Sequence, residues 1–229
     1  MLAYNNDESL KQSILAEMAG HREADRLVQG HGYWEDGKGC AVGCLIKSGD
    51  HREYETRFGI PCALAFLEDR IFEGLPEAEA QIWPERFLNA IPTGADLSMV
   101  VSKLMYWLMT DPDGIRKHAR PDELKAIEAI AELYKNRLHG KEPSIENWLS
   151  ARNAAAYDVA AYAAYAAAYY AYYAAADAAY YAAAAAYYAA DTAAYAADAA
   201  AYAADADVAR KTSFVRIADK LIEILESKD

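Results

Sequence analysis

Residues 173–205 read YAAADAAYYAAAAAYYAADTAAYAADAAAYAAD, and neither glycine nor proline occurs after Pro143. Alanine has the highest helix propensity, so a long tract without helix breakers favours helix throughout. An aspartate recurs in one phase of a seven-residue period, between two phases of tyrosine, at Asp177, Asp191, Asp198 and Asp205. The tract predicts one very long helix or a hairpin of two, with a Tyr/Asp face opposite a face of alanine.

The rest of the chain also has helical spacing of its apolar residues, and no stretch alternates with the period of two that marks a strand. Longer helices are expected at 7–29, 61–74, 96–110 and 121–139. A helix is also expected at 50–58, and Pro76, Pro84 and Pro92 are expected to separate short helices. The predicted class is all-α, with a helical N-terminal domain over 1–142. The Ala/Tyr-rich long helix or hairpin over 143–229 is the expected oligomerisation element.

The composition narrows the classes of function. The chain has 229 residues and a formal net charge of −12. Binding to nucleic acid or to anionic membranes needs a basic surface, so neither is expected. Three cysteines, an odd number, do not indicate a disulfide framework. The first residues are too charged for a signal peptide and no apolar stretch is long enough to span a membrane, so a cytoplasmic location is expected.

The segment 30–39, GHGYWEDGKG, is expected to be a loop because of its glycines. Two of these glycines leave backbone N–H groups open, the lysine adds positive charge, and the Tyr-Trp pair offers stacking faces. Such a set could hold a phosphate and a base. Nearby arginines could add cationic contacts or could pair with neighbouring glutamates. The predicted ligand-binding residues are Tyr33, Trp34, Gly37, Lys38, Gly39, Arg26 and Arg57. The alternative is a tight surface loop in which Trp34 fills a gap in the core.

A second candidate is a zinc site, because thiolate and imidazole are the ligands that zinc prefers. The residues concerned are Cys40, Cys44 and Cys62 with His31 and His51. The alternative is that the cysteines are small buried residues in an apolar run. No Ser/His/Asp order, carboxylate pair or dinucleotide fingerprint rises above chance. An enzyme therefore has little support from the sequence, and no cofactor is expected.

Four segments carry a resemblance: LVQGHGYWEDGKGCAVGC at 27–44, YETRFGIP at 54–61, LAFLEDRIFEGLP at 64–76 and AIPTGADLS at 90–98. Together they resemble a family of uncharacterised proteins of phages, prophages and bacteria, whose members join such an N-terminal domain to alanine-rich repeat helices. The resemblance implies an origin and an architecture, and it implies no mechanism. The alanine-rich helices are also similar to those of some immunity proteins of toxin systems.

These features favour a non-enzymatic binding protein of phage type. We expect a host-defence antagonist that sequesters a small anionic, nucleotide-like signal. One alternative is an inhibitor or immunity-type protein that blocks a host protein through its acidic Tyr/Asp face. Another is a metal-dependent enzyme at the cysteines and histidines. The alanine face lets helices approach closely, so a homo-oligomer is expected.

Overall fold

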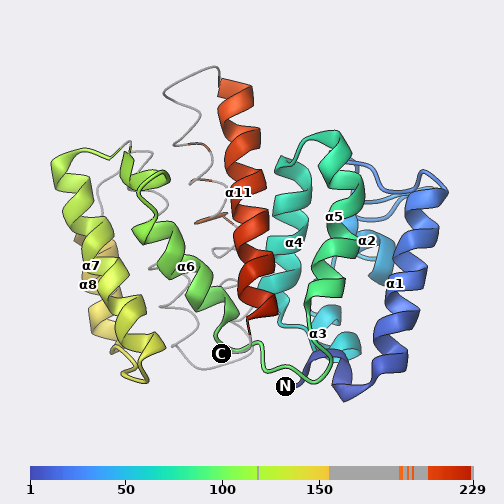
Figure 1. Cartoon of the computed structure of the whole chain (residues 1–229), viewed down its shortest axis with the longest axis horizontal. Helices are drawn as coiled ribbons and strands as arrows, with labels where there is room; N and C mark the ends of the chain where they lie inside the picture. Colours follow the sequence, from blue (N-terminus) through green and yellow to red (C-terminus); the bar gives the residue numbers. More distant parts are fainter. Residues whose placement is uncertain (118, 155–190, 193–194, 196–197, 199–205, 228–229) are drawn as a thin grey trace. The chain divides into compact units, whose positions relative to one another are not determined.

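The computed structural model describes residues 1–117, 119–154, 191–192, 195, 198 and 206–227. Within these residues the chain is mostly helical and contains no strand, which confirms the predicted all-α class (Figure 1). The predicted long helix or hairpin and most of its Tyr/Asp face lie outside the described residues. No helix among those described is long and apolar enough to cross a membrane.

The chain divides into two compact units, which are described here one at a time. Unit 1 comprises Met1–Ser98 with Ala218–Asp229, and unit 2 comprises Met99–Ile217. The predicted division into 1–142 and 143–229 stays a prediction, because most of its second part falls on residues that are not described.

Unit 1 holds most of the N-terminal helices. Its α5 packs between α1 and α4, and α2 contacts both α1 and α4 (Figure 1). The α3 helix packs on α4 and on the short η1 turn. The elements are η1 (Ala3–Asn6), α1 (Glu8–Glu23), α2 (Ala41–Ile46), α3 (Glu53–Phe58), α4 (Cys62–Gly74) and α5 (Glu77–Ala90), with the last residues of α11 (Ala206–Glu226).

The core of unit 1 follows the predicted apolar stripes. On α4, Leu64, Leu67 and Ile71 are fully buried, as the helical spacing predicts. The opposite side of α4 is also covered, because the Phe66 ring stacks on the His51 ring with 3.9 Å between centroids. This helix is therefore covered on two sides.

In unit 1 the largest differences from the predicted helix boundaries are in α1 and α5. Helix α1 ends at Glu23 rather than near residue 29, because Asp25 takes a left-handed conformation (φ 51°). The amides of Asp25 and Arg26 then donate to the carbonyls of Arg22 and His21, which closes the helix end. Further along, α5 continues through Pro84 instead of ending there.

Unit 2 contains a second helical core. Its α6 packs on α7, and α7 packs on α8. The elements are α6 (Val100–Thr110), η2 (Ile115–Lys117), α7 (Pro121–Leu138), α8 (Ile145–Ala154) and α11 up to Ile217. The predicted helix 121–139 agrees with α7 to one residue, whereas α6 begins four residues later than predicted.

Candidate ligand-binding site

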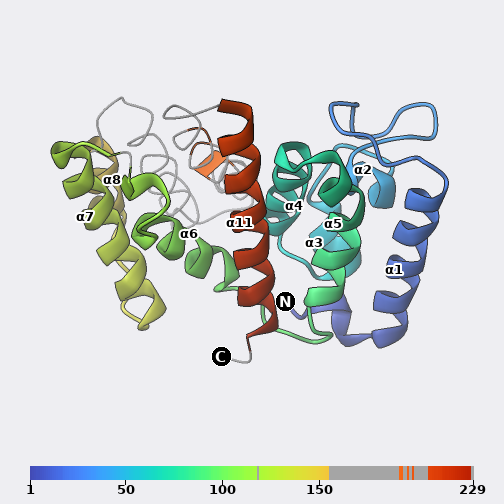
Figure 2. The same cartoon turned by 45° about the horizontal axis from the view of Figure 1, so that its top comes forward.

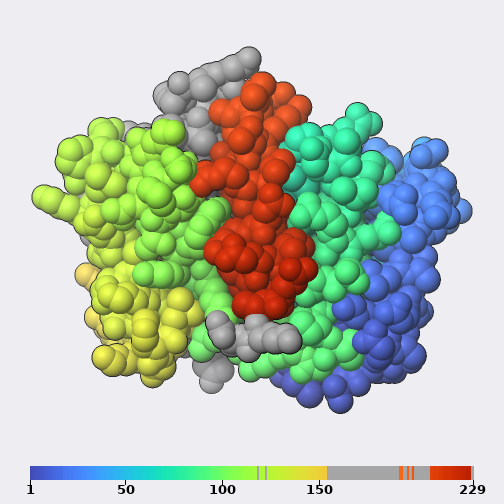
Figure 3. Space-filling model, in the orientation of Figure 1, coloured from blue at the N-terminus to red at the C-terminus, as the bar shows by residue number. Residues whose placement is uncertain are grey.

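The predicted loop 30–39 contains a tight hairpin turn. Glu35 and Lys38 exchange backbone hydrogen bonds of 2.8 and 3.0 Å. Between them Asp36 and Gly37 both have positive φ, 50° and 80°, which is the pattern of a two-residue type I′ turn. The segment lies beyond α2 at the surface of unit 1 (Figures 2 and 3). Lys38 is exposed on this turn.

The hairpin is joined to the segment that follows α1. Gly39 donates its N–H to the carbonyl of Arg26 at 3.0 Å, and Val28 donates to the carbonyl of Gly39 at 3.0 Å. The Gly39 amide is therefore used within the protein, and the prediction that it stays open for a ligand is wrong. In the parallel bridge between Leu27 and Gly39, Arg26 and Lys38 are the residues that precede the two partners.

Tyr33 anchors the loop through its backbone. A Cβ atom added to Gly43 would lie 1.4 Å from the Tyr33 carbonyl oxygen, and one added to Gly39 would lie 2.0 Å from it. The Tyr33 ring meets the His51 ring edge to face at 5.1 Å and stays 43% exposed. Glycine at 39 and 43 is therefore a packing requirement of the loop.

Trp34 is held beside a lysine and a histidine. The Lys47 ammonium lies 4.5 Å from the centroid of the Trp34 ring, and the His21 ring meets it edge to face at 5.5 Å. The Lys47 ammonium also donates to the Cys44 carbonyl, to His21 Nε2 at 2.7 Å and to Glu17 at 3.0 Å. These three acceptors occupy its three protons. The Trp34 side chain is half-buried beside this group, and both interpretations of the loop remain predictions.

His21 is buried against this group and serves as an acceptor. Burial, and then the positive charge of Lys47, lower the pKa of His21. The neutral ring can accept the Lys47 proton at Nε2, which the 2.7 Å contact requires. Arg26 contributes in the same direction to the pKa of His21.

The other arginines considered as ligand contacts already have acidic partners. Arg22 pairs with Glu85, and Arg57 lies 3.5 Å from Glu53 on α3. The contacts of Arg57 are with Glu53, Phe58 and Asn5, none of which belongs to the loop. Among the described residues, Arg26 and Lys38 form no ion pair with a carboxylate. They are the exposed cations of this region that remain available to a ligand.

The cysteines are buried and protonated. Burial raises the pKa of Cys44 to about 11 and that of Cys62 to about 12, and it raises the pKa of Cys40 further. All three are free thiols. Within the part of the chain that the structure describes, no three His, Cys, Asp or Glu side chains are grouped so that they could hold a metal ion. His51 instead donates Nδ1–H to the Gly49 carbonyl at 3.0 Å.

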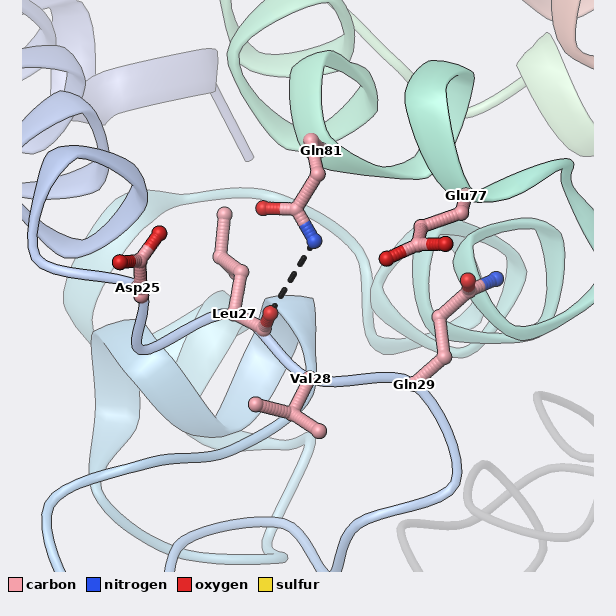
Figure 4. Close-up of a pocket in the computed structure, with 6 residues that line it drawn as sticks. All are labelled: Asp25, Leu27, Val28, Gln29, Glu77 and Gln81. Carbon is pink, nitrogen blue, oxygen red and sulfur yellow. Dashed lines mark hydrogen bonds between the residues drawn. The ribbon is translucent and has the colours of Figure 1, made fainter.

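A pocket of about 510 Å³ is lined by the segment that follows α1 and by the first turns of α5. Figure 4 shows the side chains of Asp25 and Glu77 at opposite sides of Gln81, whose amide nitrogen donates to the Leu27 carbonyl at 3.1 Å. The lining residues are Asp25, Leu27, Val28, Gln29, Glu77 and Gln81.

No family model matches the chain, and no match was found among curated proteins or solved structures.

Backbone hydrogen bonds at Gly39 join the loop that carries Trp34 and Lys38 to the segment that carries Arg26, whereas Arg57 lies on α3. Sequence reasoning missed Lys47 and the pocket residues on α5. Lys47 ends α2 in a left-handed conformation (φ 58°), which turns its side chain back onto the loop. Nothing in the local sequence pattern marks this, because it depends on the packing of α1 on α2.

Proposed function

We propose that this chain is a non-enzymatic binding protein that holds a small anionic, nucleotide-like ligand at the Trp34 platform. We use this name for Trp34 with Arg26 and Lys38. The observation that carries the proposal is a ring held by Lys47 on a loop that is joined to the Arg26 segment. Arg26 and Lys38 are exposed, and neither forms an ion pair within the part of the chain that the structure describes. Aromatic rings stack on bases, and arginine and lysine bind phosphate, so the platform offers both contacts that a nucleotide needs.

The fixed ring supports binding because its position does not have to be ordered by the ligand. Lys47 has all three protons engaged by His21, Glu17 and Cys44, so this ammonium holds Trp34 rather than the ligand. A platform that is already in place loses less conformational entropy on binding. Arg26 and Lys38 would then contact the negative charge of the ligand.

The wider role follows the resemblance of the N-terminal segments to phage and prophage proteins. In this proposal the protein acts in the cytoplasm as a host-defence antagonist, and it sequesters a signal molecule without converting it. Self-association through the alanine-rich helices would bring several platforms into one assembly. Sequestration needs binding alone, which agrees with the buried, protonated state of the thiols.

The blocking of a host protein through the Tyr/Asp face has less support. Of the four periodic aspartates, Asp191 is buried and Asp198 pairs with Arg210 at 2.8 Å. Asp198 remains partly exposed in this ion pair, and Asp177 and Asp205 lie outside the described residues.

Two measurements test the proposal in order. Native mass spectrometry of the protein purified from cells reports any retained ligand together with the oligomer. Calorimetry against a panel of cyclic and linear nucleotides then measures affinity. The proposal expects at least one nucleotide to bind without being converted. Absence of binding across the panel, or turnover of a bound nucleotide, would contradict it.

A further inference from the structure

The pocket between α5 and the segment after α1 has a chemistry opposite to that of the Trp34 platform. Its side chains present two carboxylates, Asp25 and Glu77, and two amide groups, Gln29 and Gln81. Leu27 and Val28 supply the apolar part of the lining. Among the described residues that line it there is no lysine, arginine or histidine, so the charged side chains of the lining are all acidic.

The amide groups of the pocket are oriented so that their oxygens remain as acceptors. The amide nitrogen of Gln29 donates hydrogen bonds to the carbonyls of Phe72 and Leu75, at 2.6 and 3.0 Å. Gln81 commits its amide nitrogen to the Leu27 carbonyl. Since the nitrogen atoms are held by the backbone, the side chains offer the pocket mainly hydrogen-bond acceptors.

The two carboxylates are not neutralised by the protein. Neither Asp25 nor Glu77 forms an ion pair among the described residues. Glu77 lies in the first turn of α5, where the helix dipole favours a negative charge. Asp25 follows the C-terminal end of α1, where the dipole disfavours it. A cation bound in the pocket would therefore stabilise the negative charge of Asp25.

We propose that this pocket binds a small aliphatic amine with an ammonium group at each end. Figure 4 shows the two carboxylates on opposite sides of the pocket, with Leu27 and Val28 between them. One ammonium would be held by Asp25 and the other by Glu77, and the apolar chain would lie over Leu27 and Val28. A volume of about 510 Å³ accommodates such a ligand. None of the three residues of the Trp34 platform lines this pocket, although Arg26 lies in the chain between Asp25 and Leu27, and the inference does not depend on the proposed function.

Calorimetry with 1,4-diaminobutane and spermidine tests this inference. Both should bind, and Glu77→Gln and Asp25→Asn should each weaken binding about 10-fold or more by removing one charged contact. Asparagine tolerates the left-handed backbone at position 25, and circular dichroism checks that each variant folds. Glu79→Gln, a change of the same kind on α5 outside the pocket, is the matched control and should bind normally.

Three further experiments distinguish which kind of cation the pocket binds. N-acetyl-lysine amide, which has a single ammonium and represents a lysine of a partner protein, should bind more weakly than 1,4-diaminobutane. Magnesium chloride should not compete at equal concentration, and Lys38→Ala should leave amine binding unchanged. Three results would overturn the proposal: equal affinity for N-acetyl-lysine amide and 1,4-diaminobutane, tighter binding of magnesium than of the diamine, or an equal loss of amine affinity in Glu77→Gln and Glu79→Gln.

Discussion

The carbonyl oxygen of Tyr33 occupies the space where a side chain on Gly43 would begin, since an ideal Cβ there would lie 1.4 Å from it. This contact joins the loop that carries Trp34 to helix α2. It also explains why the apolar run 40–47 contains a glycine within a short helix, where glycine is otherwise unfavourable.

Gly43→Ala should therefore destabilise unit 1, because the clash is with backbone and no flexible side chain can move away. We expect a loss of about 1–3 kcal/mol or more in the free energy of unfolding, measured by chemical denaturation. Gly20→Ala is the matched control. A Cβ at Gly20 would have no neighbour within 4 Å, so alanine there should stabilise helix α1 by about 0.5–1 kcal/mol. Equal effects of the two changes would contradict the packing described here.

Stability should depend on pH through Glu68. This carboxyl is fully buried, and burial followed by the negative charge of Asp69 raises its pKa well above the ordinary value of 4.5. The folded state then holds a proton that the unfolded state releases, so the stability is fully present below about pH 4.5 and is lost as the pH rises toward the folded pKa. Glu68→Gln should flatten this decline in denaturation curves measured from pH 4 upward. An unchanged slope would show that Glu68 is ionised in the folded protein.

The thiols should react slowly in the native protein. With pKa values of about 11 for Cys44 and about 12 for Cys62, and a raised pKa for Cys40, almost no thiolate is present at neutral pH. A colorimetric disulfide reagent should label them only after denaturant is added. Rapid labelling of one thiol under native conditions would show that a cysteine is accessible and activated. That result would support the alternative that the protein is an enzyme.

The assembly state is a separate prediction. Alanine has little surface to bury, so the alanine face is expected to gain stability from packing on another helix. Light scattering should give a mass that is a multiple of 25.2 kDa at micromolar concentration. A mass of one chain across the concentration range would contradict self-association.

Much of the fold could be predicted from local sequence. The stripe of Leu64, Leu67 and Ile71 identified α4, and Pro121 with Gly140 identified the limits of α7. The end of α1 was missed because Asp25 takes the left-handed position that a glycine usually fills. Pro84 was expected to break a helix, yet α5 continues through it. Such local exceptions are decided by packing and leave no periodic signal.

The candidate site was predicted in part. The glycines and the aromatic pair predicted the loop, and Arg26 and Lys38 precede the two partners of the parallel Leu27–Gly39 bridge. The sequence did not show which aromatic residue anchors the loop, because that depends on the contact of Tyr33 with Gly43, ten positions away. It also did not show that Lys47 reaches back to Trp34.

The measurement that tests the central claim most directly is calorimetry of the tightest-binding nucleotide with charge variants of the Trp34 platform. Arg26→Ala and Lys38→Ala should each weaken binding about 10-fold or more, because each removes a charged contact with the ligand, and the helical signal should stay intact. Lys141→Ala, an exposed lysine in unit 2, controls for the change in net charge and should bind as the unchanged protein does. If all three variants bind equally, or if no nucleotide binds at all, the Trp34 platform is not the ligand site.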